Sequence, residues 1–466
     1  MPKLELWELR AEFALRLSLM YGEEVPAYNT LVEVSTAVNR DYIDRHGAGA
    51  ERLGSVSRVT AERHGAIRVG SAQEMAQAAR LFAAFGMYPV GFYDLRDASS
   101  SAVPVVSTAF RPIDAAELAR NPFRVFTSML AVADQRFFDP EMQKQITDFV
   151  NARELFSEDL LRLADKAADQ KGLDLQEVEQ LLVMATAAFK ISDDPVDFEW
   201  YKKLEKISAV AADIGGVSTT HINHLTPRVL DIDELYVRMQ ARGITMIDEI
   251  QGPPAWEGPD VLLRQTSFRA LAEQRTFSFA DGTVGQGELR VRFGEVEQRG
   301  LALTHKGRDL YDRMVADTDN LLAADDSGST RVDVARKVWQ LNLPRNEKEL
   351  AAQGLAYFTY RINETARAAS GPTPSATIAE LLTAGVAVPE PIVYEDFLPR
   401  SAAGIFQSNL TDDGFKDEEQ AAAQYDIDRM SQILGTTVYD PNTLYQEQED
   451  ASIAALAEHL KIDIIH

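Results

Sequence analysis

A short pattern, His-x-x-x-Arg, occurs twice in the chain, at His64–Arg68 and at His224–Arg228. In an extended strand residues i and i+4 point to the same face, so each copy would place an imidazole and a guanidinium on one surface. The same interval separates the histidine from the next helix-opening residue in both copies. This matching register predicts an internal repeat, and it favours His224 over His221 as the counterpart of His64.

The segments around the two copies predict the same order of elements, β-α-β-β-β. In the first copy we expect a strand at 62–70, a helix at 71–85 and strands at 88–95, 103–110 and 123–130. In the second we expect a strand at 220–228, a helix at 232–242 and strands at 244–250, 261–269, 275–279 and 288–304. The sequence therefore predicts an α+β protein that contains two βαβββ modules.

Helical periodicity fills most of the remaining chain. The predicted division is an N-terminal helical region at 1–61, the first module at 62–135, a helical insertion at 136–216, the second module at 217–305 and a mostly helical C-terminal region at 306–466. Within the last region, residues 394–410 combine aromatic and small residues, which is typical of a loop that lines a pocket.

Charge and composition exclude several classes of function. With 47 basic and 72 acidic residues the net charge is −25, which would repel nucleic acids and anionic membranes, so neither is an expected partner. The start of the chain lacks the features of a signal peptide and no apolar run is long enough to span a membrane, so a cytoplasmic location is expected. There is no cysteine, so a metal would need His, Asp or Glu ligands.

A predicted strand near residue 295 carries charges where a core would want apolar residues. Alternation puts Glu295, Glu297 and Arg299 on one face, which is unfavourable unless they meet each other, water or a metal. Two histidines and one carboxylate on three strands match the facial triad of non-haem Fe(II) oxygenases, with Mn(II) as the near competitor. The alternatives are structural histidines, an exposed or ion-paired strand, and arginines that only pair with surface carboxylates.

Four stretches together resemble the hydroxyglutarate synthase (2-oxoadipate dioxygenase/decarboxylase) family over nearly the whole chain. They are His64-x-x-x-Arg68, Asn223-His224-x-Thr-Pro-Arg228, Phe293-Gly-Glu295-Val-Glu-Gln-Arg299-Gly300 and Ser401-Ala-Ala-Gly-Ile-Phe-Gln-Ser-Asn409. The paired modules also resemble the vicinal oxygen chelate fold, in which they would form a central half-barrel.

The resemblance implies a metal site and a substrate site. Fe(II) would be bound by His64, His224 and a glutamate, with Arg68 and the segment at Arg400 and Ser401 holding the substrate. Hydroxyphenylpyruvate dioxygenase, a more distant relative, is similar in its Glu-x-x-Gln-Arg string, which selects Glu295 as the metal ligand and leaves Glu297 as the alternative. Arg400 departs from the small apolar residue of some relatives, and its charge could alter substrate preference.

The implied reaction uses a 2-oxo dicarboxylic acid and O2. It would convert 2-oxoadipate to 2-hydroxyglutarate, in its D form, and carbon dioxide, as a step in lysine catabolism. Arg68 would pair with the distal carboxylate and so fix the chain length of the substrate. Two other functions are open: a metal-dependent lyase or isomerase of the same fold, and a non-catalytic metabolite-binding protein whose histidines and Glu295 are paired core residues.

Overall fold

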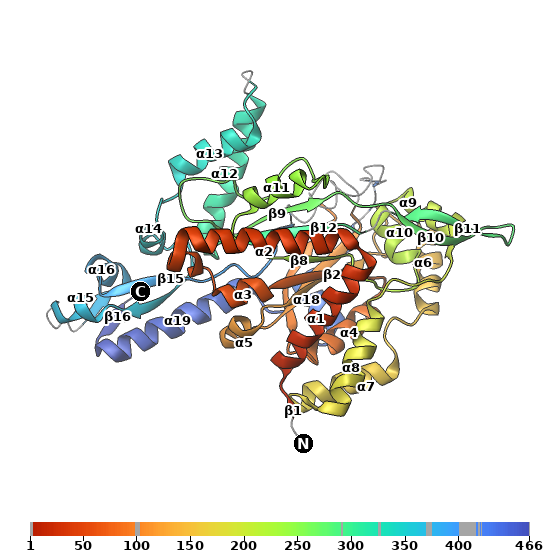
Figure 1. Cartoon of the computed structure of the whole chain (residues 1–466), viewed down its shortest axis with the longest axis horizontal. Helices are drawn as coiled ribbons and strands as arrows, with labels where there is room; N and C mark the ends of the chain where they lie inside the picture. The colour runs from red at the N-terminus through yellow and green to blue at the C-terminus, as the bar shows by residue number, and fades with distance from the viewer. Residues whose placement is uncertain are drawn as a thin grey trace.

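The structure, a computed structural model, describes residues 3–97, 103–289, 292–324, 328–369, 375–399, 416–417, 420 and 422–465. Strands from the middle of the chain lie between helices that come from all parts of it (Figure 1). The predicted α+β class is confirmed. In the part of the chain that is described, no helix is both long enough and apolar enough to cross a membrane.

Two long helices open the chain, α1 (Leu6–Glu24) and α2 (Pro26–His46), followed by the 3-10 helix η1 (Gly47–Glu51) and α3 (Val56–Ala61). Pro26 is the first residue of α2, where its missing N–H is not needed for a helical hydrogen bond. The short strand β1 (Lys3–Leu4) precedes them and pairs with β6 (Leu173–Asp174). The predicted N-terminal helical region is thus present.

The elements predicted for the first module form in the predicted order. They are β2 (Arg63–Val69), α4 (Ala72–Ala83), β3 (Tyr88–Asp94), β4 (Val105–Arg111), α5 (Ala115–Arg120) and β5 (Arg124–Leu130). The Ser71 side chain accepts a hydrogen bond from the Glu74 amide and so caps α4. Asp114 caps α5 in the same way, which adds a helix between the last two strands.

The main sheet has the strand order β3-β4-β5-β2-β8, where β8 is His224–Pro227. β2 lies between β5 and β8, parallel to β5 and antiparallel to β8. Because side chains alternate along a strand, His64, Ala66 and Arg68 point to one face of β2, and Ile67 and Val69 point to the other. Each face is covered by its own apolar core, so the first face lies inside the molecule.

The second module continues from β8 through α11 (Ile232–Ala241), β9 (Leu263–Phe268) and β12 (Gly294–Arg299). β12 pairs antiparallel with β9. Arg228 forms a parallel bridge with Glu297, which sets β12 beside the end of β8. The first strands of the two modules, β2 and β8, therefore pair with each other, and β12 lies on the far side of β8.

The predicted strand at 244–250 is wrong. This stretch meets β9 only at the isolated bridges Met246–Phe268 and Gln251–Gln265, which are further apart along this stretch than along β9. The extra residues bulge out of register and interrupt a regular ladder. Gly252 follows with a positive φ of 100°, packed against the carbonyl of Leu263, so the chain turns away directly after the second bridge.

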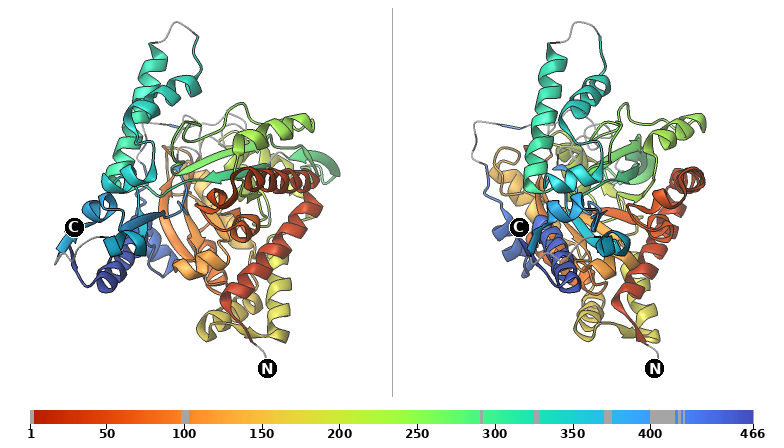
Figure 2. Two further views of the ribbon diagram at one scale, coloured as in Figure 1. Left: turned by 60° about the vertical axis from the view of Figure 1, so that its left-hand side comes forward. Right: turned by 90° about the vertical axis from the view of Figure 1, so that its left-hand side faces the viewer.

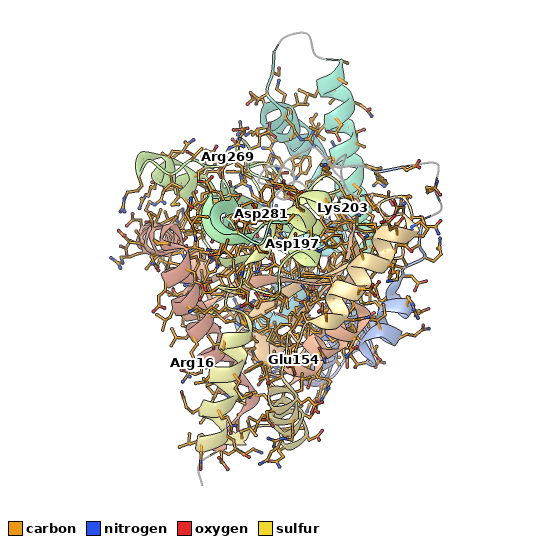
Figure 3. All side chains as sticks on the ribbon, turned by 90° about the vertical axis from the view of Figure 1, so that its right-hand side faces the viewer. Arg16, Glu154, Asp197, Lys203, Arg269 and Asp281 are labelled. Carbon is orange, nitrogen blue, oxygen red and sulfur yellow. The ribbon has the colours of Figure 1, made fainter. Side chains whose placement is uncertain are left out.

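The strand predicted at 275–279 forms, but outside the central sheet. β10 (Glu273–Ser278) and β11 (Val284–Leu289) form a hairpin whose β10 pairs with β7 (Val196–Asp197) of the insertion. The predicted strand at 288–304 is therefore divided between the end of β11 and β12. Most of the hairpin is polar and partly or fully exposed, and only its Phe277 and Leu289 are buried, so it lacks the continuous apolar face that a strand of the central sheet requires. Figure 3 shows this side, with Asp197 and Asp281 labelled.

Helices dominate the insertion, as predicted. They are α6 (Pro140–Ala152), α7 (Glu158–Gln170), α8 (Leu175–Ala188), α9 (Phe198–Glu205) and α10 (Ala209–Gly215). α9 and α10 are separate helices, because Ser208 takes an extended conformation and caps α10. The end of α10 leads into the segment before β8.

The C-terminal region is helical with short strands. It comprises α12 (His305–Ala323), α13 (Arg331–Asn342), α14 (Glu347–Ala352), β13 (Phe358–Ile362), α15 (Glu364–Ala369), β14 (Ser375–Thr377), α16 (Ile378–Thr383), β15 (Ala387–Pro391), α18 (Ile427–Leu434), α19 (Pro441–Leu460) and β16 (Asp463–Ile465). α14 is followed by Gly354, which has a positive φ of 62°, and the chain then continues into β13. The α12–α13 pair projects from the body (Figure 2).

Candidate metal centre

Three neighbouring strands bring His64, His224 and Glu295 to one point. His64 is near the start of β2, His224 begins β8, and Glu295 is near the start of β12. In the antiparallel register, His64 lies opposite Thr226 and His224 lies opposite Ala66, so both imidazoles rise from the same face. All three side chains are buried. The repeat therefore brings its two histidines together, as the sequence predicts.

The ligand-type atoms of this triad lie within 4.8 Å of one another. Glu295 Oε2 is 2.8 Å from His224 Nε2 and 3.3 Å from His64 Nε2. The two rings are nearly perpendicular, with an interplanar angle of 85° and centroids 5.3 Å apart. Two imidazole nitrogens and one carboxylate that converge in this way form a donor set suited to a divalent transition metal.

Burial and charge act differently on the three groups. Burial lowers the pKa of His224, which favours the neutral ring that a metal ligand must be. Burial also acts to lower the pKa of His64, but the charges of Glu297 and Glu295 outweigh it and the pKa is raised. For Glu295 burial acts to raise the pKa, but the two histidines outweigh it and hold it at about 2. Glu295 is therefore ionised at neutral pH, and its negative charge favours a bound cation.

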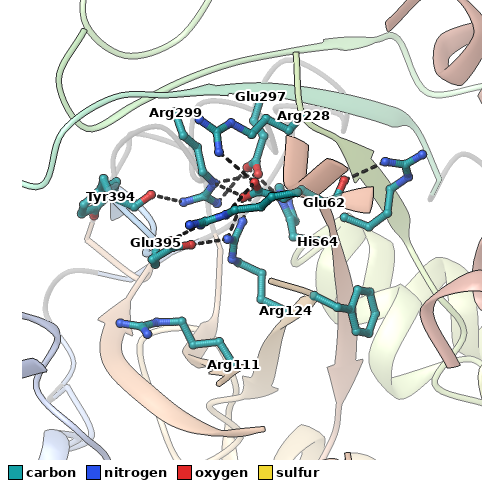
Figure 4. Close-up of polar contacts among 12 residues, drawn as sticks. Glu62, His64, Arg111, Arg124, Arg228, Glu297, Arg299, Tyr394 and Glu395 are labelled. Atoms are coloured by element: carbon teal, nitrogen blue, oxygen red, sulfur yellow. Dashed lines mark hydrogen bonds and ion pairs between the residues drawn. The ribbon is translucent and has the colours of Figure 1, made fainter. Parts of the chain in front are cut away.

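The two glutamates that the sequence left as alternatives have different surroundings. Glu295 faces the Nε2 atoms of both histidines, whereas Glu297 Oε2 lies 2.8 Å from Nδ1 of His64 only. Glu297 also pairs with Arg299 and Arg124, and these charges hold its pKa below the usual value in spite of burial. Glu297 belongs to a buried cluster of arginines and carboxylates next to the triad (Figure 4).

Arg68 lies four residues after His64 on the same face of β2, but it already has a partner. It forms a buried ion pair with Asp213 of α10. Asp213 also accepts a hydrogen bond from Asn223 Nδ2 at 3.0 Å and lies 3.2 Å from His221 Nε2. The positive charge of Arg68 contributes to lowering the pKa of His224, so the guanidinium is close enough to influence the triad.

His221, the alternative to His224, lies outside the triad. It contacts Asp213 and Asn223. Arg228, the counterpart of Arg68, pairs with Glu62 at 2.8 Å and donates a hydrogen bond to the Leu53 carbonyl. Arg400 and Ser401, predicted to hold substrate, lie outside the described residues.

Several residues around the triad were not predicted. Gln265 Nε2 donates a hydrogen bond to Glu295 Oε1 at 2.7 Å, and Thr226 Oγ1 donates one to Oε2 at 3.3 Å. Phe397 packs edge-on against the His64 ring and Phe293 packs against the His224 ring, with centroids 5.0 and 5.2 Å apart. Thr226 could have been found from strand alternation with His224. Asp213 and Phe397 give no local signal, because they come from an insertion and from the C-terminal region.

Comparison with known proteins identifies the family. A family model described as 2-oxoadipate dioxygenase/decarboxylase matches residues 13–409. The chain belongs to this family. A 2-oxoadipate dioxygenase/decarboxylase of Mycobacterium bovis is 54% identical over 443 residues, covering 95% of this chain and 97% of the relative. One from Pseudomonas putida is 40% identical over 464 residues, covering 97% of both.

The family resemblance extends to the fold. A crystal structure of the hydroxyglutarate synthase of Pseudomonas putida in complex with 2-oxoadipate is similar to this structure, with a TM-score of 0.81 and 38% sequence identity. The match covers 99% of this chain and 100% of that one. The family predicted from the four sequence motifs is thus confirmed, and the similarity includes the helical regions as well as the sheet.

Proposed function

We propose that this protein is a 2-oxo acid dioxygenase that converts 2-oxoadipate and O2 to 2-hydroxyglutarate and carbon dioxide. The observation that carries the proposal is the buried triad of His64, His224 and Glu295 in a chain of the 2-oxoadipate dioxygenase/decarboxylase family. The relative of Pseudomonas putida, which aligns over almost the whole chain, was crystallised with 2-oxoadipate. A metabolite-binding protein without catalysis would not need a buried donor set of this kind.

Fe(II) is the metal that we assign to the triad, with His64 Nε2, His224 Nε2 and one Glu295 oxygen as its ligands. The absence of any cysteine and the lowered pKa of His224 both fit such a set. When bound, Fe(II) supplies sites for the 2-oxo acid and for dioxygen and the capacity to transfer electrons between them. Because Gln265 and Thr226 both donate to Glu295, the carboxylate is held in place before any metal binds.

Arg68 is the residue that we assign to the distal carboxylate of the substrate. Its guanidinium is buried on the same face as His64, and the ion pair with Asp213 fixes its orientation. A planar guanidinium can hold Asp213 with one edge and a substrate carboxylate with another. Fixing the far end of the substrate at a set distance from the triad would select the chain length of the acid.

Two further parts of the proposal concern the frame of the site. The pairing of β2 with β8, with β5 and β12 on their outer sides, supports two modules, at 62–135 and 217–305, that form a half-barrel of the vicinal oxygen chelate type around the triad. Arg400 and Ser401 of the pocket loop would complete the substrate site, since Phe397 of the same loop packs against the His64 ring. The aromatic rings beside both histidines would exclude water from the reaction.

Product analysis tests the proposal. Protein loaded with Fe(II) under anaerobic conditions receives 2-oxoadipate and ¹⁸O-labelled dioxygen, and the products are identified by mass. We expect loss of one carbon as carbon dioxide and a five-carbon hydroxy acid with one label in the new carboxylate and one at the carbinol. Glutarate without the hydroxyl would contradict the second half of the reaction. No consumption of oxygen with any 2-oxo acid would contradict the whole proposal.

A further inference from the structure

His64 lies between two carboxylates that contact opposite sides of its ring. Glu295 Oε2 is 3.3 Å from Nε2, and Glu297 Oε2 is 2.8 Å from Nδ1. Both glutamates come from the same face of β12 because they are two residues apart. The spacing of the strand thus gives one carboxylate to each nitrogen of a single imidazole.

Glu297 is itself held on both oxygens. Arg299 donates from Nε to Oε1 at 2.7 Å and from Nη2 to Oε2 at 2.9 Å, which is a bidentate arrangement. Arg124 donates to Oε1 at 3.2 Å. With both oxygens engaged, the carboxylate cannot rotate without breaking charge-assisted hydrogen bonds, so the position of Oε2 beside His64 Nδ1 is fixed.

The two arginines are fixed in turn by residues from distant parts of the chain. Arg124 donates to Glu62 at 2.8 Å. Arg299 donates from Nη1 to the carbonyls of Tyr394 and Asp396, at 2.8 and 3.0 Å. Figure 4 shows these groups converging on Glu297 and His64. The same cluster therefore anchors the segment that carries Phe397, which packs edge-on against the His64 ring.

We propose that Glu297 is a positioning residue for the metal centre: it accepts the Nδ1 proton of His64 and so fixes the tautomer and the ring orientation that direct the Nε2 lone pair to the metal. A carboxylate behind a ligating histidine raises the basicity of the ligand and prevents the ring from turning. The inference rests on the proposed function, since it takes His64 Nε2 as a metal ligand. Glu297 acts through His64 and does not contact the metal.

The second histidine is held differently. Among the described residues, Nδ1 of neither ring makes a regular hydrogen bond, but the two differ in what faces them: the Glu297 carboxylate lies 2.8 Å from Nδ1 of His64, whereas Nδ1 of His224 has no ion-pair partner and its ring packs on Phe293. The two histidines can therefore be compared within one protein, because the Glu297 carboxylate lies behind His64, whereas Phe293 packs against His224. An effect of Glu297 should appear at His64 and leave His224 unchanged.

Metal binding provides the first test. Glu297→Ala removes the acceptor, and we expect the dissociation constant for Fe(II) or Mn(II), measured anaerobically, to rise roughly 10- to 100-fold. Glu297→Gln retains a neutral acceptor and should show a smaller rise. Glu62→Gln is the matched control, because Glu62 is equally buried and pairs with Arg124, Arg228 and Arg299 but does not contact His64. It should bind the metal within about threefold of the wild type, although it removes the same charge from the same cluster.

The tautomer provides the second test, on the wild-type holoprotein. With ¹⁵N-labelled histidine and diamagnetic Zn(II) in the site, only seven imidazoles contribute to the NMR spectrum. We expect a proton on Nδ1 of His64 that is protected from exchange and shifted downfield, and a weaker, less shifted signal in Glu297→Gln but not in Glu62→Gln. A His64 that binds the metal through Nδ1, or that has no protected Nδ1 proton, would overturn the inference even if the Glu297 variants fail to fold.

The outcomes separate the inference from the proposed function. If the wild type takes up no metal, or takes up metal without a change in the His64 and His224 resonances, the proposed function fails. If the wild type binds metal through both histidines and the Glu297→Ala variant binds it as well as the Glu62→Gln control, the proposed function stands and the positioning role of Glu297 falls.

Discussion

In the first copy of His-x-x-x-Arg, the arginine pairs with Asp213 beside the triad. In the second copy, Arg228 pairs with Glu62 in the buried arginine cluster. The histidines of the two copies nevertheless meet at one carboxylate, Glu295. The repeat fixes the strand positions of the histidines and arginines, but the partner of each arginine decides what that arginine does: Asp213 comes from the helical insertion, and Glu62 is the residue before β2. A symmetric pattern thus supports one shared site and two unlike arginines.

The largest effect is expected where the two copies act together. His64→Ala, His224→Ala and Glu295→Ala should each lose bound metal and all measurable activity, because two remaining donors hold a divalent ion weakly. Metal content after anaerobic loading and oxygen uptake with 2-oxoadipate measure this. His221→Ala is the matched control and should retain the metal. Retention of metal in His224→Ala with loss in His221→Ala would overturn the register of the repeat, and loss in Glu297→Ala with retention in Glu295→Ala would exchange the two glutamates.

Arg228 is expected to stabilise the fold and not to bind the substrate. Arg228→Ala leaves Glu62 buried with one partner fewer, and we expect it to lower the free energy of unfolding by roughly 3–5 kcal/mol. Urea denaturation of the metal-loaded protein measures this. The protein that remains folded should keep its KM for 2-oxoadipate. A large rise in KM without loss of stability would give Arg228 the role assigned to Arg68.

Arg68, in contrast, is expected to bind the substrate. Arg68→Ala is expected to retain the metal and to lose roughly 2–5 kcal/mol of productive binding of dicarboxylic 2-oxo acids. Arg68→Lys should rescue poorly, since an ammonium cannot hold Asp213 and a second carboxylate with a planar fork. Steady-state kinetics should be compared for 2-oxoadipate and for a monocarboxylic 2-oxo acid. The difference between them isolates the binding of the distal carboxylate from the binding of the 2-oxo acid group. Unchanged kinetics in Arg68→Ala would remove its assigned role.

A smaller effect should separate the two histidines by their protonation. Burial lowers the pKa of His224, whereas Glu297 and Glu295 outweigh burial at His64 and raise its pKa above 6.5. Between 6.5 and that raised pKa, metal-free protein holds a proton on His64 that a metal must displace. Metal affinity should therefore rise with pH in this window by up to about tenfold per pH unit and level off above it.

Calorimetry of metal binding in buffers of different ionisation enthalpy measures the released proton. The same raised pKa stabilises the metal-free fold at low pH, and this contribution is lost as the pH rises through the pKa of folded His64. Binding without proton release at about pH 6.5 would contradict the assignment.

The features of this molecule that a local sequence pattern determines could be predicted, and those that depend on contacts between remote segments could not. Local alternation and spacing are enough for the first module, for His64 and His224, and for the pair Glu295 and Glu297 as candidates. The family was also accessible from its motifs and is confirmed. Spacing could not separate the two glutamates, because they share a face and differ only in which nitrogen of His64 they meet.

The errors come from tertiary context. The stretch at 244–250 has the composition of a strand, but a bulge against β9 interrupts its ladder. The hairpin of β10 and β11 looked like part of the second module, yet it pairs with the insertion instead. Asp213 reaches Arg68 from the insertion and Phe397 reaches His64 from the C-terminal region, and no local pattern marks a residue that contacts the site across such a distance in sequence.

The central claim is that one Fe(II) lies between the two copies of the repeat. The most direct measurement is anomalous X-ray diffraction at the iron edge from crystals loaded with Fe(II) and kept anaerobic. The account predicts one strong peak within about 2.0–2.2 Å of Nε2 of His64, Nε2 of His224 and a carboxylate oxygen of Glu295. A peak at Asp213 and His221, a peak at Glu297, or no peak in protein that turns over 2-oxoadipate would contradict it.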